Sequence, residues 1–203
     1  MALTKRARAW LATLSHDPSL PTAVVERLIL DAGSTPHALW LAFHDAYAGY
    51  IEEVGPGDIA MWGLARGATE QPAPYWNRPD AVDIIPAKRQ FPEAIRCADA
   101  NPVHEYELGA DGWFSGIGGP CESFDMKIER HGIKQEFHAR GQVKRTLLTH
   151  DSDRADHQKL LADMAAALVP EASGSHAKFF LEPRRLLQFN PHIKQLQLFE
   201  LEP

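Results

Sequence analysis

The sequence predicts an α+β fold: helices near the N-terminus, a central, mostly antiparallel sheet of short strands closed by a helix, and a C-terminal extension of a helix and strands. Three observations carry this prediction. Apolar residues recur at helical spacing as far as Tyr47. From Tyr50 onward, short apolar runs alternate with Gly and Pro, which is typical of strands and turns. A helical pattern returns at Phe124 and again after residue 153.

The first fifty residues are expected to form three helices, because their apolar side chains repeat every three or four positions. The first helix covers residues 7–14. The second begins at Thr22 and ends at Gly33, a residue type suited to a helix C-terminus. The third begins near Ser34 and ends around Tyr47, with a proline in its first turn. We interpret the apolar faces of these helices as core.

Short strands are predicted in the middle of the chain. One strand is expected around Ile59–Leu64, and others lie within residues 81–100. Residues 103–116 form two apolar runs around the turn Gly109–Gly112, which is the pattern of a hairpin. Residues 122–137 then predict a helix whose apolar positions anchor it on the sheet.

The C-terminal part is expected to contain a helix over residues 153–170, closed by a proline, and then two strands, one within residues 178–190 and one within residues 193–202. We therefore divide the chain into an α+β domain, residues 1–140, and a helix–strand extension, residues 141–203. The extension is expected to pack on the same domain.

Composition excludes several classes of protein. The formal net charge of −6 and the scattered Lys and Arg residues do not fit a nucleic-acid binder, which needs a clustered basic surface. No run of about 18 apolar residues exists that could span a membrane, and the apolar stretch 9–14 is too short for a signal peptide. The two cysteines, Cys97 and Cys121, form no C-x-x-C motif, which fits a reducing compartment. We expect a cytoplasmic protein.

Catalytic motifs are incomplete in this sequence. The glycines of residues 111–120 are followed by Pro and Cys rather than by the Lys-Ser/Thr pair of a phosphate-binding loop. Ser115 is the fourth rather than the third residue of "GWFSG", so the G-x-S-x-G pattern of a serine nucleophile is missed. We therefore expect no catalytic residue, no cofactor and no bound metal, with Cys97 as a small buried residue and the hairpin–helix segment as structural.

The segment from the hairpin to the following helix resembles the SUKH superfamily, which groups bacterial toxin-immunity proteins with fungal cell-wall regulators. In that superfamily a strand–turn–strand precedes a helix that begins with Glu-Ser-Phe. The residues that match this pattern are Tyr106, Leu108, Asp111, Gly112, Glu122, Ser123 and Phe124. The resemblance covers roughly residues 20–140.

The resemblance implies a protein that binds rather than catalyses: an immunity protein that neutralises a cognate bacterial toxin domain by covering its active or another essential surface. It carries over no catalytic residue, and it implies no particular oligomeric state. An acidic protein suits a basic partner, because complementary charge accelerates encounter. The predicted contact residues are acidic loop residues and aromatic anchors: Glu52, Glu53, Asp58, Tyr75, Trp76, Asp99, Glu105, Glu107, Asp111 and Trp113.

Two alternatives stay open at this stage. One is a metal-dependent hydrolase, because His and Asp side chains ligate metals and five of them gather in "HDSDRADH" (His150, Asp151, Asp153, Asp156 and His157). The same acids also favour the first turn of a helix, which is the structural interpretation. The other alternative is a scaffold or regulator of the same fold that has no toxin partner.

Overall fold

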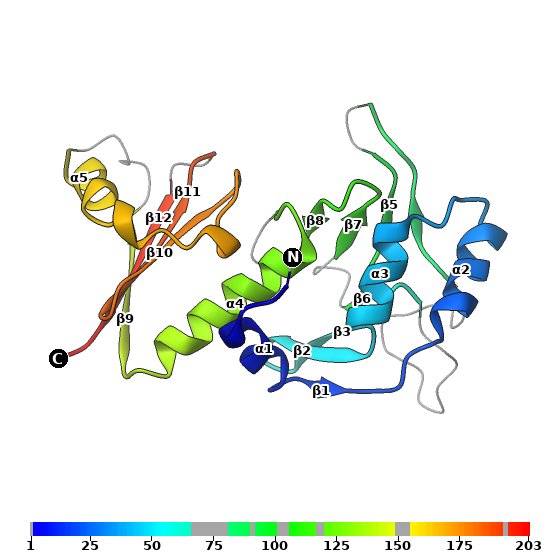
Figure 1. The fold of residues 1–203 in the computed structure, drawn as a ribbon, viewed down its shortest axis with the longest axis horizontal. Coiled ribbons are helices and arrows are strands. Elements are labelled where there is room, and N and C mark those ends of the chain that lie inside the picture. Colours follow the sequence, from blue (N-terminus) through cyan, green and yellow to red (C-terminus); the bar gives the residue numbers. More distant parts are fainter. Residues whose placement is uncertain are drawn as a thin grey trace. The chain divides into compact units, whose positions relative to one another are not determined.

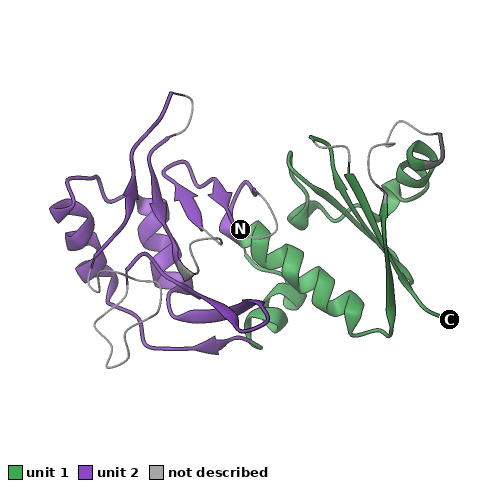
Figure 2. Cartoon of the chain, turned by 180° about the vertical axis from the view of Figure 1, so that it is seen from behind, with its two compact units in different colours: residues 1–13, 125–203 green, residues 14–124 purple. Residues whose placement is uncertain are grey.

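The computed structural model describes residues 2–65, 81–89, 92–100, 106–116, 120–148, 155–192 and 195–203. It confirms the predicted α+β fold class, with helices and three antiparallel sheets in the described residues (Figure 1). The chain forms two compact units (Figure 2): unit 1 combines Met1–Thr13 with Asp125–Pro203, and unit 2 is Leu14–Phe124.

Unit 2 contains two of the three predicted N-terminal helices, α2 (Thr22–Asp31) and α3 (Ala38–Tyr47). The predicted start of the third helix near Ser34 is wrong, because α3 begins four residues later. Thr35 precedes Pro36, and a residue before a proline disfavours helical backbone. His37, which follows the proline, is still extended, with ψ of 134°. The side chains of Ser34 and His37 instead contact Glu93, at 2.9 Å and 3.4 Å from its Oε2 atom.

Two four-stranded antiparallel sheets complete unit 2. The first has the order β1-β2-β3-β6, with strands Ser15–His16, Tyr50–Gly55, Asp58–Trp62 and Ala98–Ala100. The second has the order β4-β5-β7-β8, with strands Ile84–Ile85, Ala94–Arg96, Glu107–Gly109 and Phe114–Ser115. The predicted hairpin is confirmed as β7–β8, and its turn contains Gly112 at φ +90°, a conformation that glycine adopts without strain.

The core of unit 2 is centred on Phe124, whose ring is surrounded by four other aromatic rings. Phe43, Tyr47, Trp62 and Phe114 have ring centroids between 4.7 and 5.2 Å from that of Phe124. Three of these pairs are edge-on, the geometry that the quadrupoles of aromatic rings favour. The phenylalanine of the Glu-Ser-Phe motif therefore joins α3, both sheets and the start of α4 (Phe124–His138).

Unit 1 is built on one antiparallel sheet of order β10-β11-β12-β9. Its strands are Lys178–Leu181, Arg185–Asn190, Gln195–Leu201 and Val143–Leu148. Side chains alternate along these strands, so Phe179, Leu186 and Phe199 belong to one apolar cluster and Phe180 and Leu187 to another. The first cluster contains Ile133 and Phe137 of α4, and the second contains residues of α5 (Ala155–Asp163). The sheet is therefore covered by a helix on each face.

Three predictions for the C-terminal part are wrong in detail. No strand is predicted before the helix of residues 153–170, but residues 143–148 form β9, which pairs with β12. The single strand within residues 178–190 is two strands that pair with each other. The helix of residues 153–170 ends at Asp163 and is followed by the 3-10 turns η1 (Ala165–Ala167) and η2 (Pro170–Ala172). The strand β9 depends on pairing with the distant β12, which local periodicity does not show, whereas β10 and β11 form a local hairpin.

The compact units do not coincide with the predicted segments 1–140 and 141–203, because they divide at Phe124. The physical reason is the placement of α4, whose apolar side chains lie in the core of the C-terminal sheet. The N-terminal helix α1 (Lys5–Leu11) belongs to the same unit and packs on α4, with the backbone of Ala7 against Gly132.

Candidate protein-binding surface

Charge is distributed unequally between the two units. Unit 2 contains sixteen Asp and Glu residues but only six Lys and Arg, which gives residues 14–124 a formal net charge of −10. The remaining residues contain eleven Asp and Glu and fifteen Lys and Arg, a formal net charge of +4. The acidic character of the whole chain therefore comes entirely from unit 2.

The β2–β3 hairpin presents two different faces. Glu52, Ala60 and Trp62 are buried on the inner face. On the outer face, Glu53 lies directly opposite Ile59, and both are exposed. Neighbouring residues on one strand point to opposite faces of the sheet, so two consecutive glutamates have different environments.

Glu52 is corrected from a predicted contact residue to a core residue. Its side chain is 4% exposed, and its Oε2 atom accepts hydrogen bonds from Trp62 Nε1 and Tyr106 Oη, both at 3.2 Å. Burial, together with the neighbouring Glu52 carboxylate, raises the pKa of Tyr106 above its ordinary value, so this hydroxyl remains a donor. Glu52 thus connects β2, β3 and the segment that leads into β7.

Three of the predicted acidic residues are brought together in one sheet. Glu53 is on β2, Asp58 begins β3, and Asp99 lies on β6 with Met61 as its partner in the register. Glu53 is exposed and Asp58 is half-buried. Asp99 is far from the other two in the sequence, and the antiparallel order β2-β3-β6 brings it into the same sheet.

The other predicted contact residues belong to the second sheet or lie outside the described residues. Glu107 and Trp113 are half-buried at the β7–β8 hairpin. Asp111 is exposed, but its Oδ1 atom accepts a hydrogen bond from the backbone N–H of Trp113 at 3.0 Å, so it also stabilises the turn. The predicted contact residues that lie outside the described residues are Tyr75, Trp76 and Glu105.

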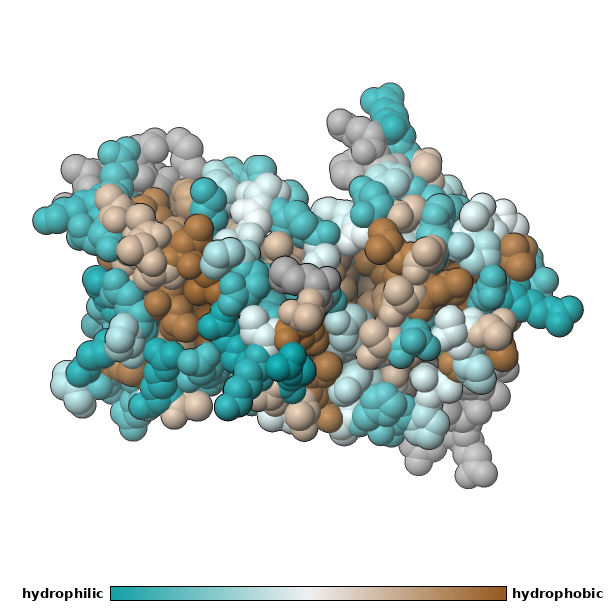
Figure 3. All heavy atoms as spheres, in the orientation of Figure 1, coloured by the Kyte–Doolittle hydropathy of each residue, from teal (hydrophilic) through white to brown (hydrophobic). Residues whose placement is uncertain are grey.

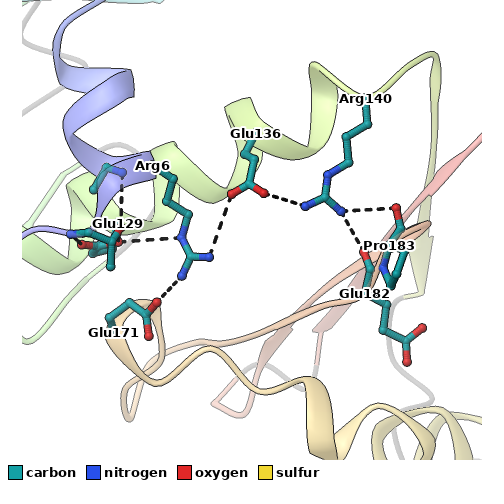
Figure 4. A network of polar contacts seen from close by, with 9 residues as sticks. Arg6, Glu129, Glu136, Arg140, Glu171, Glu182 and Pro183 are labelled. Atoms are coloured by element: carbon teal, nitrogen blue, oxygen red, sulfur yellow. Dashed lines mark hydrogen bonds and ion pairs between the residues drawn. The ribbon is translucent and has the colours of Figure 1, made fainter.

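Unit 1 has its own cluster of charged side chains, and here acids and bases neutralise one another (Figure 4). The Arg6 guanidinium contacts the carboxylates of Glu129, Glu136 and Glu171. Glu136 also accepts a hydrogen bond from Arg140 at 2.7 Å. Glu129, which is fully buried, accepts two more from the backbone N–H and the hydroxyl of Thr4, at 2.7 and 2.6 Å. These contacts attach the N-terminal segment to α4 and offer no unpaired charge to a ligand.

A shallow, open depression of about 460 Å³ also lies on unit 1, lined by Arg140, Leu181, Glu182 and Pro183. The Arg140 guanidinium donates hydrogen bonds to the backbone carbonyls of Glu182 and Pro183, at 3.1 and 3.2 Å. Its donors therefore support the fold at this point rather than a bound molecule.

A serine, a histidine and a glutamate meet in unit 2, a combination that the sequence does not indicate. The hydroxyl of Ser34 and the ring of His37 both contact the same oxygen of Glu93. Nucleophilic catalysis requires instead that the serine hydroxyl donate to the histidine while the carboxylate orients that histidine. We interpret this cluster as a structural connection between the segment preceding α3 and the segment preceding β5.

Histidine 44 is buried and serves the fold. Its Nδ1 atom accepts a hydrogen bond from the backbone N–H of Leu64 at 3.2 Å, so the ring proton is on Nε2, which donates to the carbonyl of Leu20 at 2.9 Å. Burial lowers the pKa of His44 from its usual value. The neutral ring joins α3 to the segments around β3 and α2.

The described residues hold no group of three or more His, Cys, Asp or Glu side chains that could bind a metal. Of the five residues of the predicted metal cluster, only His157 has a side chain that the structure describes. The side chains of His150, Asp151, Asp153 and Asp156 lie outside the described part of the chain. Cys97 and Cys121 are both buried and form no disulfide, and the burial of Cys97 confirms the expectation for that residue.

Within the part of the chain that the structure describes, no helix is long and apolar enough to cross a membrane. Comparison with models of protein families, with curated proteins and with solved structures found no match to this chain.

Proposed function

We propose that the chain is a non-catalytic binding protein of the immunity type, which neutralises a cognate bacterial toxin domain in the cytoplasm through the acidic surface of unit 2. The single observation that carries the proposal is the formal net charge of −10 on residues 14–124, beside +4 on the rest of the chain. Such a surface attracts a basic partner and repels other acidic proteins. The SUKH-like hairpin and the Glu-Ser-Phe motif that precedes α4 lie in the same acidic unit.

Neutralising a toxin requires only a stable surface, and unit 2 supplies one. Two of its buried polar side chains have partners within the core: Glu52 bonds to Trp62 and Tyr106, and His44 bonds to two backbone groups. Buried polar groups that are satisfied in this way favour one well-defined arrangement of the surrounding elements. A rigid surface loses less entropy on binding than a flexible one.

Co-expression tests this proposal directly. The effector domain encoded beside this gene is expressed in a sensitive host with and without the chain, and complex formation is followed by co-purification. We expect growth to be rescued and a stable complex to form. Raising the salt concentration from about 0.05 to 0.5 M should slow association at least about tenfold, because ions screen charges on exposed surfaces.

A pair of charge-reversal variants localises the effect to unit 2. Glu26→Lys with Glu53→Lys reverses two exposed acids of unit 2, and Asp163→Lys with Glu202→Lys reverses two exposed acids of unit 1. Both pairs change the net charge of the chain equally. We expect the unit 2 pair to weaken the complex more. Growth arrest despite good expression and with no complex would refute the proposed function.

A further inference from the structure

Two histidine side chains of unit 1 meet at the open end of the β10–β11 hairpin. The rings of His176 and His192 have centroids 4.8 Å apart, and their planes are inclined by 37°. His176 is half-buried and His192 is exposed. The ring nitrogens of both have no hydrogen bond or ion pair to any described residue. The pair therefore presents its nitrogen atoms side by side at the surface.

The hairpin brings these two residues together and holds the backbone around them. β10 and β11 are antiparallel, so the residues just before β10 and just after β11 lie at the same end. Before β10, the backbone N–H of Gly174 donates a hydrogen bond to the carbonyl of Ala177 at 2.8 Å. After β11, the backbone N–H of His192 donates one to Oδ1 of Asn190 at 3.0 Å. A ligand that binds both rings therefore has little more than the two side chains to order.

The distance between the rings fits two ligands of one metal ion. A nitrogen ligand lies about 2.0–2.1 Å from Zn²⁺, so the ion is about 3.2 Å from the centre of an imidazole ring that binds it. Two rings that bind one ion at angles between about 90° and 109°, as in octahedral and tetrahedral sites, have centres about 4.5–5.2 Å apart. The observed 4.8 Å lies within this range. The χ2 torsion of histidine is soft, so exposed rings can turn their nitrogens toward a common ion at low cost.

Two other histidines of the described chain serve the fold instead. Both ring nitrogens of His44 bond to backbone groups, and the ring of His37 contacts the Glu93 carboxylate at 3.4 Å. A metal at either position would have to displace these contacts. His176 and His192 have no such contact to lose within the described residues.

Apolar exposure, by contrast, does not by itself identify a ligand. On the face shown in Figure 3, hydrophobic residues lie in patches on both units, separated by hydrophilic residues. Exposed apolar side chains are normal on soluble proteins. Paired imidazoles are more informative, because histidine is the commonest metal ligand in proteins.

We propose that His176 and His192 form a two-histidine binding site for a divalent transition metal of the kind that imidazole prefers, such as Zn²⁺ or Ni²⁺. Water or a ligand from another molecule takes the remaining coordination positions. The bound ion joins the segment before β10 to the turn after β11. This site goes beyond the proposed binding function and does not depend on it, because it lies in unit 1 rather than in the acidic unit.

Titration of the metal-free, untagged full chain with NiCl₂, followed by two-dimensional amide NMR, locates the site. Ni²⁺ is paramagnetic and broadens the signals of amides close to it. We expect the first signals to broaden to be those of residues 174–178 and 190–192, and EDTA should restore them. MgCl₂ should leave the spectrum unchanged, because Mg²⁺ prefers oxygen ligands.

Three variants test whether the two rings bind one ion. Isothermal titration with ZnCl₂ compares the parent with His176→Ala, His192→Ala and the double variant. Loss of a group that merely orients a ligand lowers metal affinity about 10–100-fold, so loss of the ligand itself should cost at least about tenfold. Because each ring alone is a poor site, the double variant should bind no more than about twofold more weakly than either single variant. The matched control is His138→Ala, which removes an exposed histidine of α4 in the same unit and should bind like the parent.

Each remaining outcome would overturn the site. Broadening that begins at residues 150–157 would assign metal binding to the cluster outside the described residues. A loss in His138→Ala equal to that in His176→Ala would show binding to scattered single histidines. Unchanged affinity in either single variant, with circular dichroism like that of the parent, would show that the two rings do not share an ion.

Discussion

Replacing Gly132 by alanine places a methyl group in the contact between α4 and α1. A Cβ atom at this position would lie 2.8 Å from Cα of Ala7, 2.9 Å from N of Ala7 and 3.0 Å from the carbonyl carbon of Arg6. Ordinary contacts of a Cβ atom begin at about 3.4 Å. The nearest atoms are backbone atoms of α1, so no change of side-chain rotamer can relieve the overlap. The N-terminal helix has to move away by roughly 0.6 Å or more, from the difference between these two distances.

Two opposing effects determine the sign of the change in stability. Alanine favours a helix interior over glycine by about 0.8–1 kcal/mol. Overpacking of a close contact costs about 1–3 kcal/mol. Moving α1 also disturbs the hydrogen bonds from Thr4 to the Glu129 carboxylate, at 2.7 and 2.6 Å, and bonds to charged groups contribute about 1.5–3 kcal/mol each. The second and third effects outweigh the first, so we expect a net loss of about 1–3 kcal/mol.

Urea unfolding, followed by circular dichroism and tryptophan fluorescence, measures this loss. Trp10 reports on the contact itself, because its ring stacks on that of His131 of α4 with centroids 4.5 Å apart. A shift of α1 should change the fluorescence of the folded protein as well as the urea midpoint. The control is Gln135→Ala, a change to alanine on the exposed surface of α4, which should stay within about 0.5 kcal/mol of the parent.

A second variant makes the test more specific. Ala7→Gly removes the methyl group of α1 but leaves the backbone atoms that the new Cβ would meet. Adding it to Gly132→Ala should therefore restore no stability. The reasoning is refuted if Gly132→Ala alone raises the urea midpoint by the amount that helix propensity predicts, with Trp10 fluorescence unchanged.

Two further predictions concern buried polar groups. Glu52→Ala removes the acceptor of two buried donors and should lower the free energy of unfolding by at least about 2 kcal/mol, whereas Glu53→Ala, on the exposed face, should stay within about 0.5 kcal/mol in the same urea titration. Burial lowers the pKa values of His44 and His131, and nearby cations lower that of His131 further. The unfolded chain therefore takes up protons below about pH 6.5 that the folded chain does not, so stability should fall as the pH is lowered from 7 to 5. His131→Phe, which keeps an aromatic ring against Trp10, should flatten this pH dependence; an unchanged slope would contradict the assignment.

Local patterns predict those elements whose conformation depends on nearby residues. The apolar spacing that follows Thr22 predicts α2, and the glycine-containing turn at Gly109–Gly112 predicts the β7–β8 hairpin. The position of Phe124 after Glu and Ser predicts the beginning of α4. These elements depend on helix periodicity and turn conformation, which are properties of a few consecutive residues.

The candidate surface was predicted only in part. Residues 28–65 contain acidic residues but no Lys or Arg, which indicates an acidic region. Within this region Glu53 is exposed and Asp58 is half-buried. The opposite environments of Glu52 and Glu53 were missed because residues 50–55 were interpreted as a loop rather than as β2. Once the strand is known, the two-residue period of side chains separates the pair. The exposure of Ile59 has no signal in the sequence, because an isoleucine in a strand is more often core.

The sequence by itself determined the α+β class, the acidic character and the positions of the locally encoded helices and hairpin. The tertiary structure alone decided that residues 1–13 belong with the C-terminal sheet, that residues 143–148 become a strand, and that Phe124 ends one unit. The first outcome depends on contacts between residues more than a hundred positions apart, such as Thr4 with Glu129, and the second on the pairing of β9 with the distant strand β12. Periodicity and turn chemistry act over a few residues, whereas burial and strand pairing are settled only when distant segments meet.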